Sequence, residues 1–217
     1  MDNTQDAQAV RTLDTAALRR TLTRRMWWTS IRKGGIFAIM AFGGVSLGAD
    51  LTRAGVTWIF IIMGPCVFVG IMGLLSTLRS IPVAVVVTRS CRKTLDQYSF
   101  EEFWPAITKV DAAQATKGRP KKMTLRLHSA RNEESPLMRV EPVPPRAFWR
   151  SPWPEGIENG VYVAGDLPFG AVGYVPNSGS FFLMQPEDWE ATAQDRSSAP
   201  QDRVAKAQDA GLTGRVI

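Results

Sequence analysis

The sequence predicts a membrane protein of mixed α and β class, in which a two-helix transmembrane hairpin precedes a small antiparallel β domain. Two observations lead to this prediction: a nearly uncharged stretch from Gly34 to Leu78, and a series of short β-type runs after Phe100. The 217 residues are 45% hydrophobic and 21% charged, which on average resembles a globular protein. The average conceals an apolar stretch whose only charges are Asp50 and Arg53.

Two transmembrane spans are expected within residues 31–80, at about 31–49 and 55–78. Residues 55–78 carry no charge and would extend about 36 Å as a helix, enough to cross a hydrocarbon core of about 30 Å. The first span has fewer apolar residues. The stems of Arg32 and Lys33 would complete it at one interface.

Basic residues flank the hairpin on both sides, and the turn between the spans has one Arg. The positive-inside rule then places both termini in the cytoplasm. The abundance of Arg and Ala suggests a bacterial genome, so the expected location is the bacterial cytoplasmic (inner) membrane. A cleaved signal peptide ending near residues 46–49 is the alternative for the first span.

Small residues inside the first span suggest a close helix contact. Gly44 and Gly48 lie four positions apart and share one helix face, which favours tight packing of a second helix. Pro65 is expected to weaken or bend the second span. No ionisable residue lies in the core of either span, which argues against an ion pathway or a proton relay.

Two segments border the hairpin. Residues 1–30 form an amphipathic cytoplasmic segment that either lies on the inner leaflet or extends the first span. Residues 81–99 are expected to form a juxtamembrane helix, although the run 81–87 is also compatible with a strand. A third span is excluded because Arg79 and Arg89 leave too few uncharged residues between them.

Residues 100–186 are expected to form a cytoplasmic β domain, an SH3-like or OB-like barrel. The proline-rich stretch Glu141 to Pro154 is predicted to be an irregular excursion between strands, and residues 187–217 a polar, flexible tail. Turn-forming residues separate the six predicted strands, which are Trp104–Val110, Met123–His128, Leu137–Val140, Gly160–Ala164, Ala171–Val175 and Phe181–Met184.

The sequence offers no recognisable catalytic constellation. It has two cysteines and one histidine, His128, and it lacks phosphate-loop, dinucleotide, zinc and nucleophile-elbow motifs. We therefore expect no catalytic residue, no cofactor and no metal site, and a protein that is not an enzyme. A site built from residues far apart in the sequence is the remaining enzymatic alternative.

One basic run lies in the predicted β domain. Lys117, Arg119, Lys121 and Lys122 could contact anionic lipid, because the domain would hang directly below the bilayer. A solvated turn is the simpler alternative. Nucleic acid is not an expected partner, since the rest of the domain is acidic and no aromatic RNA-binding motif accompanies the run.

Three short motifs carry a resemblance to a known group. They are Cys91-Arg92-Lys93-x-Leu95-x-x-Tyr98, then Val161-Tyr162-Val163-Ala164-Gly165-Asp166-x-x-Phe169-Gly170, then Val175-Pro176-x-x-Gly179. Over about residues 91–180 the chain resembles an uncharacterised actinobacterial integral membrane protein family with an N-terminal transmembrane hairpin and a cytoplasmic β-rich domain. The resemblance implies an inner-membrane location and no particular activity.

These features favour a non-enzymatic, membrane-anchored interaction or adaptor protein that presents its β domain at the inner leaflet. Its partners would be the lipid bilayer and a second protein or another copy of the chain. Phe148, Trp149 and Trp153 are the candidate partner contacts, because exposed aromatic residues dominate many interfaces. The alternative is an accessory subunit of a larger membrane complex, packed through the Gly44 and Gly48 face.

Overall fold

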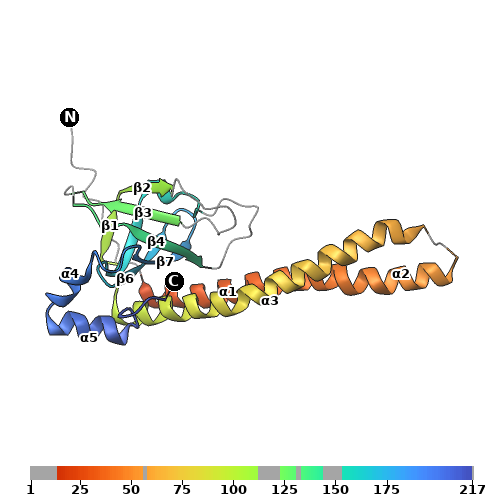
Figure 1. Ribbon diagram of the computed structural model, residues 1–217, viewed down its shortest axis with the longest axis horizontal. Helices are drawn as coiled ribbons and strands as arrows, with labels where there is room; N and C mark the ends of the chain where they lie inside the picture. Colours follow the sequence, from red (N-terminus) through yellow and green to blue (C-terminus); the bar gives the residue numbers. More distant parts are fainter. Residues whose placement is uncertain (1–13, 56–57, 112–122, 131–132, 144–152, 217) are drawn as a thin grey trace. The chain divides into compact units, whose positions relative to one another are not determined.

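The computed structural model describes residues 14–55, 58–111, 123–130, 133–143 and 153–216 (Figure 1). It divides into two compact units. The hairpin unit comprises residues 23–85, and the β unit comprises residues 1–22 and 86–217. We describe each unit by itself.

Helical segments account for the hairpin unit and for its continuation at both ends. Asp14 begins the first helix, because its Oδ1 accepts hydrogen bonds from the backbone N–H groups of Ala16 and Ala17, both 3.0 Å long. Gly55, with φ of 88°, lies just beyond the last helical residue before the turn. The segments are α1 (Thr15–Ala38), the π-helical turn η1 (Ile39–Gly43), α2 (Gly44–Arg53) and α3 (Ile59–Gln97).

Residues 81–87, which the sequence left between helix and strand, are helical in the structure and belong to α3. This helix contains both Pro65 and Pro82. A proline removes one backbone donor but leaves the neighbouring turns of a long helix intact. The helix ends at Gln97, so the juxtamembrane segment is the last part of α3 and not a separate helix.

The β unit contains one curled, seven-stranded antiparallel sheet, a half-barrel, with strand order β1-β5-β6-β7-β4-β3-β2. The choice between an SH3-like and an OB-like barrel stays a prediction. Each of the six predicted runs overlaps a strand, but the first divides at Pro105, which cannot donate to a ladder. The strands are β1 (Glu102–Trp104), β2 (Ala106–Asp111), β3 (Met123–His128), β4 (Met138–Val143), β5 (Val161–Asp166), β6 (Gly170–Val175) and β7 (Ser180–Pro186).

The proline-rich stretch from Glu141 begins inside the sheet. Strand β4 continues through Pro142 to Val143 and pairs with β7, with Pro142 opposite Phe182. The prediction of an irregular excursion from Glu141 onward was therefore wrong at its start. Burial of Pro142 and Val143 against the sheet outweighs the lost proline donor.

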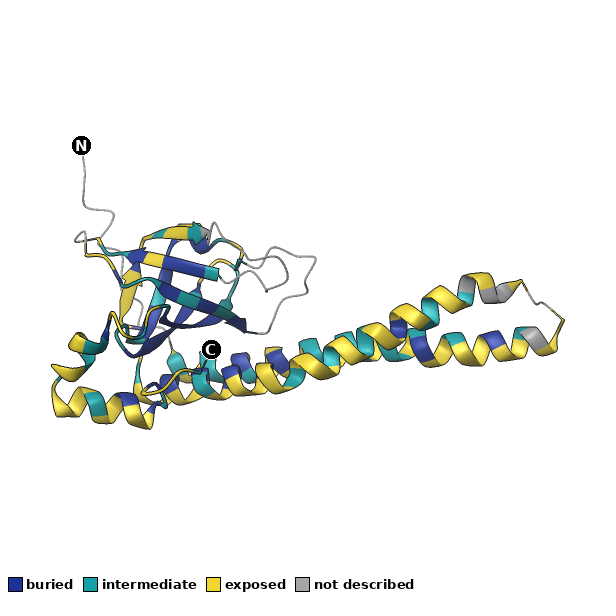
Figure 2. Ribbon diagram, viewed as in Figure 1, coloured by how far each residue is buried: buried dark blue, intermediate teal, exposed yellow. Residues whose placement is uncertain are grey.

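Strand β7 is buried on both of its faces, at every residue after Ser180 (Figure 2). Phe182 and Met184 point into one core, and Phe181 and Leu183 into another, as the two-residue period of a strand requires. The first core also contains Trp104, Leu125, Leu127, Met138, Val140, Ile157, Val161, Val163, Ala171 and Val175.

The second core brings in helical residues from both ends of the apolar region. Leu22 of α1 and Val87, Cys91 and Leu95 of α3 are buried there, against residues of four strands of the sheet. An ion pair between Arg19 and Asp96 joins the same two helix ends. The first turns of α1 and the last turns of α3 are thus part of the folded β unit. The strand residues of this core are Val143, Ala164, Val172, Phe181 and Leu183, with Phe100 from the link before β1.

The segment 187–217, expected to be a flexible tail, contains two helices in the structure, α4 (Ala193–Ser197) and α5 (Gln201–Asp209). Ala207, Ala210 and Leu212 are buried in a small core with Phe169, which comes from the turn between β5 and β6. These few apolar residues fall on one face, whereas the average composition of the segment is polar. A composition average therefore missed the docked helix.

Candidate functional site

The contact between the two arms of the hairpin unit involves glycines on both arms. A Cβ atom built on Gly44 would lie 2.7 Å from Cγ2 of Val67, and one on Gly70 would lie 2.6 Å from the backbone nitrogen of Ala41. A Cβ on Gly48 would meet Cβ of Met63 at an ordinary 4.0 Å. Gly44 thus permits close helix packing inside this chain, and Gly48 lies at a looser contact. Gly70, on the second arm, was not among the predicted packing residues.

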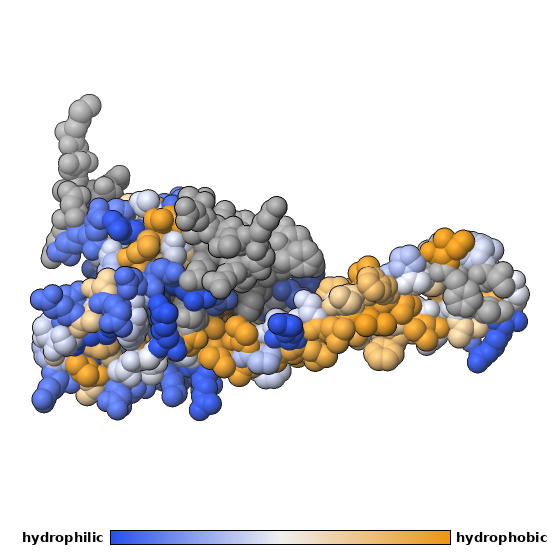
Figure 3. Space-filling model, viewed as in Figure 1, coloured by the Kyte–Doolittle hydropathy of each residue, from blue (hydrophilic) through white to orange (hydrophobic). Residues whose placement is uncertain are grey.

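The hairpin also presents an apolar surface (Figure 3). Among the described residues, the exposed large hydrophobic side chains lie between Trp27 and Val86, with Phe103 of β1 as the one exception. The runs Thr15–Leu51 and Met63–Gln97 are long and apolar enough to cross a membrane, by length and composition. A lipid environment would cover such a surface, which water does not favour.

Tryptophans lie exposed at both ends of this surface. Trp28 is 69% exposed on α1 and Trp58 is 61% exposed next to the turn. Tryptophan is enriched where a membrane meets water, because its ring is apolar and its N–H is polar. Exposed tryptophans therefore lie near both ends of the candidate spans.

Trp153, one of the three predicted partner contacts, is half-buried and packs against the first core of the β unit. Lys109 Nζ lies 5.7 Å from the centre of its ring and 3.3 Å from Glu158 Oε2. Part of the Trp153 ring therefore stabilises the β unit by packing against its first core. Phe148 and Trp149 lie outside the described residues, as do the lipid-contact candidates Lys117, Arg119, Lys121 and Lys122.

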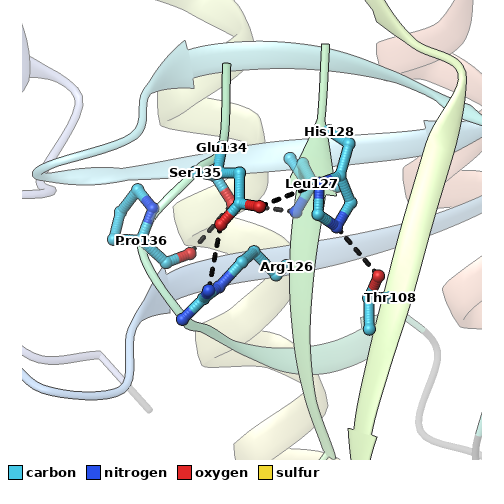
Figure 4. Close-up of polar contacts among 7 residues, drawn as sticks. All are labelled: Thr108, Arg126, Leu127, His128, Glu134, Ser135 and Pro136. Atoms are coloured by element: carbon cyan, nitrogen blue, oxygen red, sulfur yellow. Dashed lines mark hydrogen bonds and ion pairs between the residues drawn. The ribbon is translucent and has the colours of Figure 1, made fainter. Parts of the chain in front are cut away.

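His128 is the centre of a polar cluster on β2, β3 and the segment that follows β3 (Figure 4). Its Nε2 lies 2.8 Å from Thr108 Oγ1, and its Nδ1 lies 3.6 Å from Glu134 Oε1. Arg126 donates a hydrogen bond of 3.0 Å to the other oxygen of Glu134. The order hydroxyl, imidazole, carboxylate resembles that of a hydrolase triad.

Other contacts give this cluster a structural explanation. His128 and Glu134 form an isolated antiparallel bridge, and Ser135 Oγ accepts a 2.9 Å hydrogen bond from the backbone N–H of Leu127. Thr108 and Glu134 are exposed, and Arg126 shares the carboxylate. The cluster thus attaches Glu134 and Ser135, which follow β3, to residues of β3, and it links β3 to β2 through His128 and Thr108. The His128 side chain is 29% exposed.

The turn between β5 and β6 is a tight hairpin turn whose carboxylate has a partner on another element. Asp166 pairs with Gly170 across the hairpin, and its carbonyl accepts a 2.8 Å hydrogen bond from the N–H of Phe169. Arg203 of α5 donates two hydrogen bonds to the Asp166 carboxylate, at 2.8 and 3.0 Å. The Asp166 carboxylate therefore anchors the C-terminal helix.

Tyr98 contacts the same helix. Lys206 Nζ is 4.4 Å from the centre of the Tyr98 ring, and burial, followed by the nearby charge of Asp166, raises the pKa of the phenol. The Tyr98 hydroxyl is buried without a hydrogen-bond partner in the described part of the chain. These contacts complete the attachment of α5.

No known protein family, curated protein or solved structure matches the chain. The observed architecture, two long apolar helices and a β domain, agrees with the description of the membrane protein group that the sequence resembles. The comparisons identify no family to which the chain belongs.

Proposed function

We propose that the protein is a non-enzymatic adaptor of the bacterial inner membrane, anchored by its helical hairpin and presenting its β domain at the inner leaflet to a protein partner. The apolar surface of the hairpin unit is the observation that carries this proposal. Trp27 to Val86 hold nearly all the exposed large hydrophobic residues of the described chain. A hairpin of this kind is stable when lipid covers it.

The orientation follows from charge. Arg24, Arg25, Arg32 and Lys33 precede the first apolar arm and Arg79 follows the second, whereas the turn holds Asp50 and Arg53 as an ion pair of 3.2 Å. Short loops rich in Lys and Arg remain in the cytoplasm. Both termini and the β unit are therefore cytoplasmic in this proposal.

The adaptor role is supported by the way in which the β unit is built. Its second core includes Leu22 before the first arm and Val87 after the second, so no linker separates the domain from the anchor in the sequence. Such a domain would remain close to the inner leaflet. Phe148 and Trp149 remain the proposed partner contacts, and the basic run 117–122 the proposed lipid contact.

Cysteine accessibility tests the topology. Cys91 is fully buried, so the native thiol is a poor probe of sidedness. In a Cys66→Ala background, we would introduce cysteine at Ala54 in the turn or at Gln208 on α5, both of which are exposed. A membrane-impermeant maleimide added to intact cells should label the first position only. Labelling of Gln208→Cys in intact cells would refute the orientation.

Site-specific photocrosslinking tests the adaptor role. A photoreactive amino acid at position 149 should yield a discrete crosslinked product in cells, whereas the same probe at exposed Gln208 should yield none. If probes at positions 148 and 149 both give no crosslinked product, a partner bound through the proline-rich segment is contradicted. A product whose mass is twice that of the chain would identify a second copy as the partner.

The accessory-subunit alternative depends on a different surface from the one first considered. Gly44 packs against Val67 of the same chain, so this glycine already has a helix partner. A foreign helix would instead contact the exposed residues of the hairpin. Copurification of one stoichiometric membrane protein that survives mutation of Phe148 and Trp149 would favour this alternative.

A further inference from the structure

A cavity in the β unit lies between α5, the strands β1 and β5, and the link that follows α3. Its volume is about 160 Å³. An engineered cavity of about 150 Å³ holds benzene, so a molecule of about six to eight non-hydrogen atoms fits a space of this size. The cavity is therefore large enough for a small metabolite.

Carboxylates from the start of the sheet line one part of this cavity. Glu102 is the first residue of β1, and Glu101 precedes it. Glu101 Oε1 accepts a 2.5 Å hydrogen bond from the Ser99 hydroxyl, whereas the described residues give the Glu102 carboxylate no hydrogen bond or ion pair. Glu102 is thus the carboxylate that is available to a ligand.

An ammonium group from another element lines the same cavity. Lys206 belongs to α5, and its Nζ lies 4.4 Å from the centre of the Tyr98 ring. Tyr98 also lines the cavity, so this contact holds the ammonium group at the wall. Lys206 forms no ion pair with a carboxylate in the described part of the chain. Opposite charges therefore line one cavity without pairing directly.

Apolar side chains complete the lining. Val163 lies opposite Glu102 in the pairing of β5 with β1, and it is buried in the first core. Leu167, from the turn after β5, is half-buried and packs against the same core. An apolar wall with a few convergent polar groups is typical of sites for small molecules.

The charges of the lining select the class of ligand. A simple anion would be repelled by the two carboxylates, and a simple cation by Lys206. A molecule that carries both signs matches both. An α-amino acid with a branched apolar side chain also has a group that suits the apolar wall. Valine has these three groups and the appropriate size.

We infer that this cavity binds a small zwitterionic amine, an α-amino acid of about the size of valine. The ammonium group of the ligand pairs with Glu102, and its carboxylate pairs with Lys206. Its side chain contacts Val163 and Leu167. The inference goes beyond the adaptor role and does not rest on membrane insertion. Because β1 supplies Glu102 and α5 supplies Lys206, the bound ligand connects the C-terminal helix to the sheet.

The test uses the detergent-solubilised full chain and three probes: valine, isobutylamine and isovalerate. Isobutylamine is valine without its carboxylate, and isovalerate is valine without its ammonium group. Saturation-transfer NMR of the methyl signals, followed through a titration, would give the three dissociation constants. Valine should bind about three- to fivefold more tightly than either fragment, since each fragment lacks one charge pair. Failure of valine to bind, or equal binding of all three probes, would refute the inference.

Two substitutions test the two ends of the site separately. Lys206→Met should weaken the binding of valine and isovalerate about three- to fivefold and leave isobutylamine unchanged. Glu102→Gln should weaken valine and isobutylamine to the same extent and leave isovalerate unchanged. Lys93→Met and Glu190→Gln are the matched controls, because both residues are exposed and lie outside the cavity lining. The same change for all three probes, or a change in a control variant, would refute the site.

Amide hydrogen exchange tests the connection between α5 and the sheet. Saturating valine should slow exchange in α5, because a ligand that binds the docked helix stabilises the docked state. Isobutylamine lacks the group that pairs with Lys206, so it should not slow this exchange. Valine binding without slower exchange in α5 would refute the contribution of Lys206 to the site.

Discussion

Gly44 and Val67 approach so closely that a side chain on the glycine has no room: its Cβ would lie 2.7 Å from Cγ2 of Val67. Gly44 has ordinary helical dihedral angles, with φ of −63° and ψ of −41°. The requirement for glycine is therefore one of space and not of backbone conformation. Together with Gly70 on the other arm, it determines how closely the arms can approach.

Gly44→Ile should destabilise the hairpin by about 1–3 kcal/mol, the usual cost of overpacking. The matched control is Gly64→Ile, because a Cβ on Gly64 has no atom within 4 Å. Thermal unfolding of the detergent-solubilised chain, followed by circular dichroism, would measure both. Equal effects of the two substitutions would show that the Gly44 contact does not form.

Arg203→Ala should loosen the C-terminal helix. The side chain of Asp166 is only 9% exposed, and it would lose both hydrogen bonds from the guanidinium group. We expect a loss of about 1–2 kcal/mol and faster amide hydrogen exchange in α5. Gln208→Ala on the exposed side of the same helix is the control. Unchanged exchange in Arg203→Ala would contradict the anchoring role.

Leu212→Ala should cost about 2–4 kcal/mol of folding free energy, because it leaves a cavity at a fully buried position. Half-buried Val204 contacts the same small core, so Val204→Ala should cost less. Denaturant unfolding of the full chain would rank the two. A Leu212→Ala variant as stable as wild type would support the flexible tail expected from composition.

Glu141→Gln should stabilise the β unit at neutral pH. Burial raises the pKa of Glu141, and Arg139 offsets part of the rise. The folded state therefore disfavours the ionised carboxylate. The resulting loss of folding free energy is complete above the pKa of Glu141 in the folded state, and it is absent below the ordinary pKa of glutamate. The melting temperature of Glu141→Gln should exceed that of wild type at neutral pH, and the two should converge in acid.

Glu158 provides a comparison of opposite sign. Its own backbone N–H, and then the hydrogen bond from Lys109, lower the pKa of this carboxyl. The ionised form is favoured in the folded state, so its contribution is present above the ordinary pKa and lost as the pH falls through the folded pKa. Glu158→Gln should therefore lower the melting temperature at neutral pH and not in acid. Parallel shifts in the two variants would contradict these assignments.

The strands were predictable because turn residues separate them clearly. Residues 123–128 were assigned as a strand with the bounds that β3 has in the structure. The division of the first run at Pro105 and the extension of β4 through Pro142 were missed. Both depend on which backbone groups face a neighbouring strand, and this is a property of the sheet.

The candidate site was less predictable than the fold. A four-residue spacing identified Gly44, but its partner Val67 lies in a segment that only helix packing brings alongside. Likewise, the contact between Gly70 and Ala41 depends on the register between the two arms. Glycines can be located in the sequence, whereas the residues that face them on another helix cannot.

The sequence by itself determined the apolar hairpin, its charge asymmetry and the β class of the domain, because these depend on local composition and period. Only the tertiary structure decided that Leu22 and Val87 belong to the core of the β unit, and that Arg203 reaches Asp166, 37 positions away. Such contacts are long-range, and their energy arises from burial and charge pairing between segments. No local window of residues contains both partners, so their pairing emerges only when the chain folds.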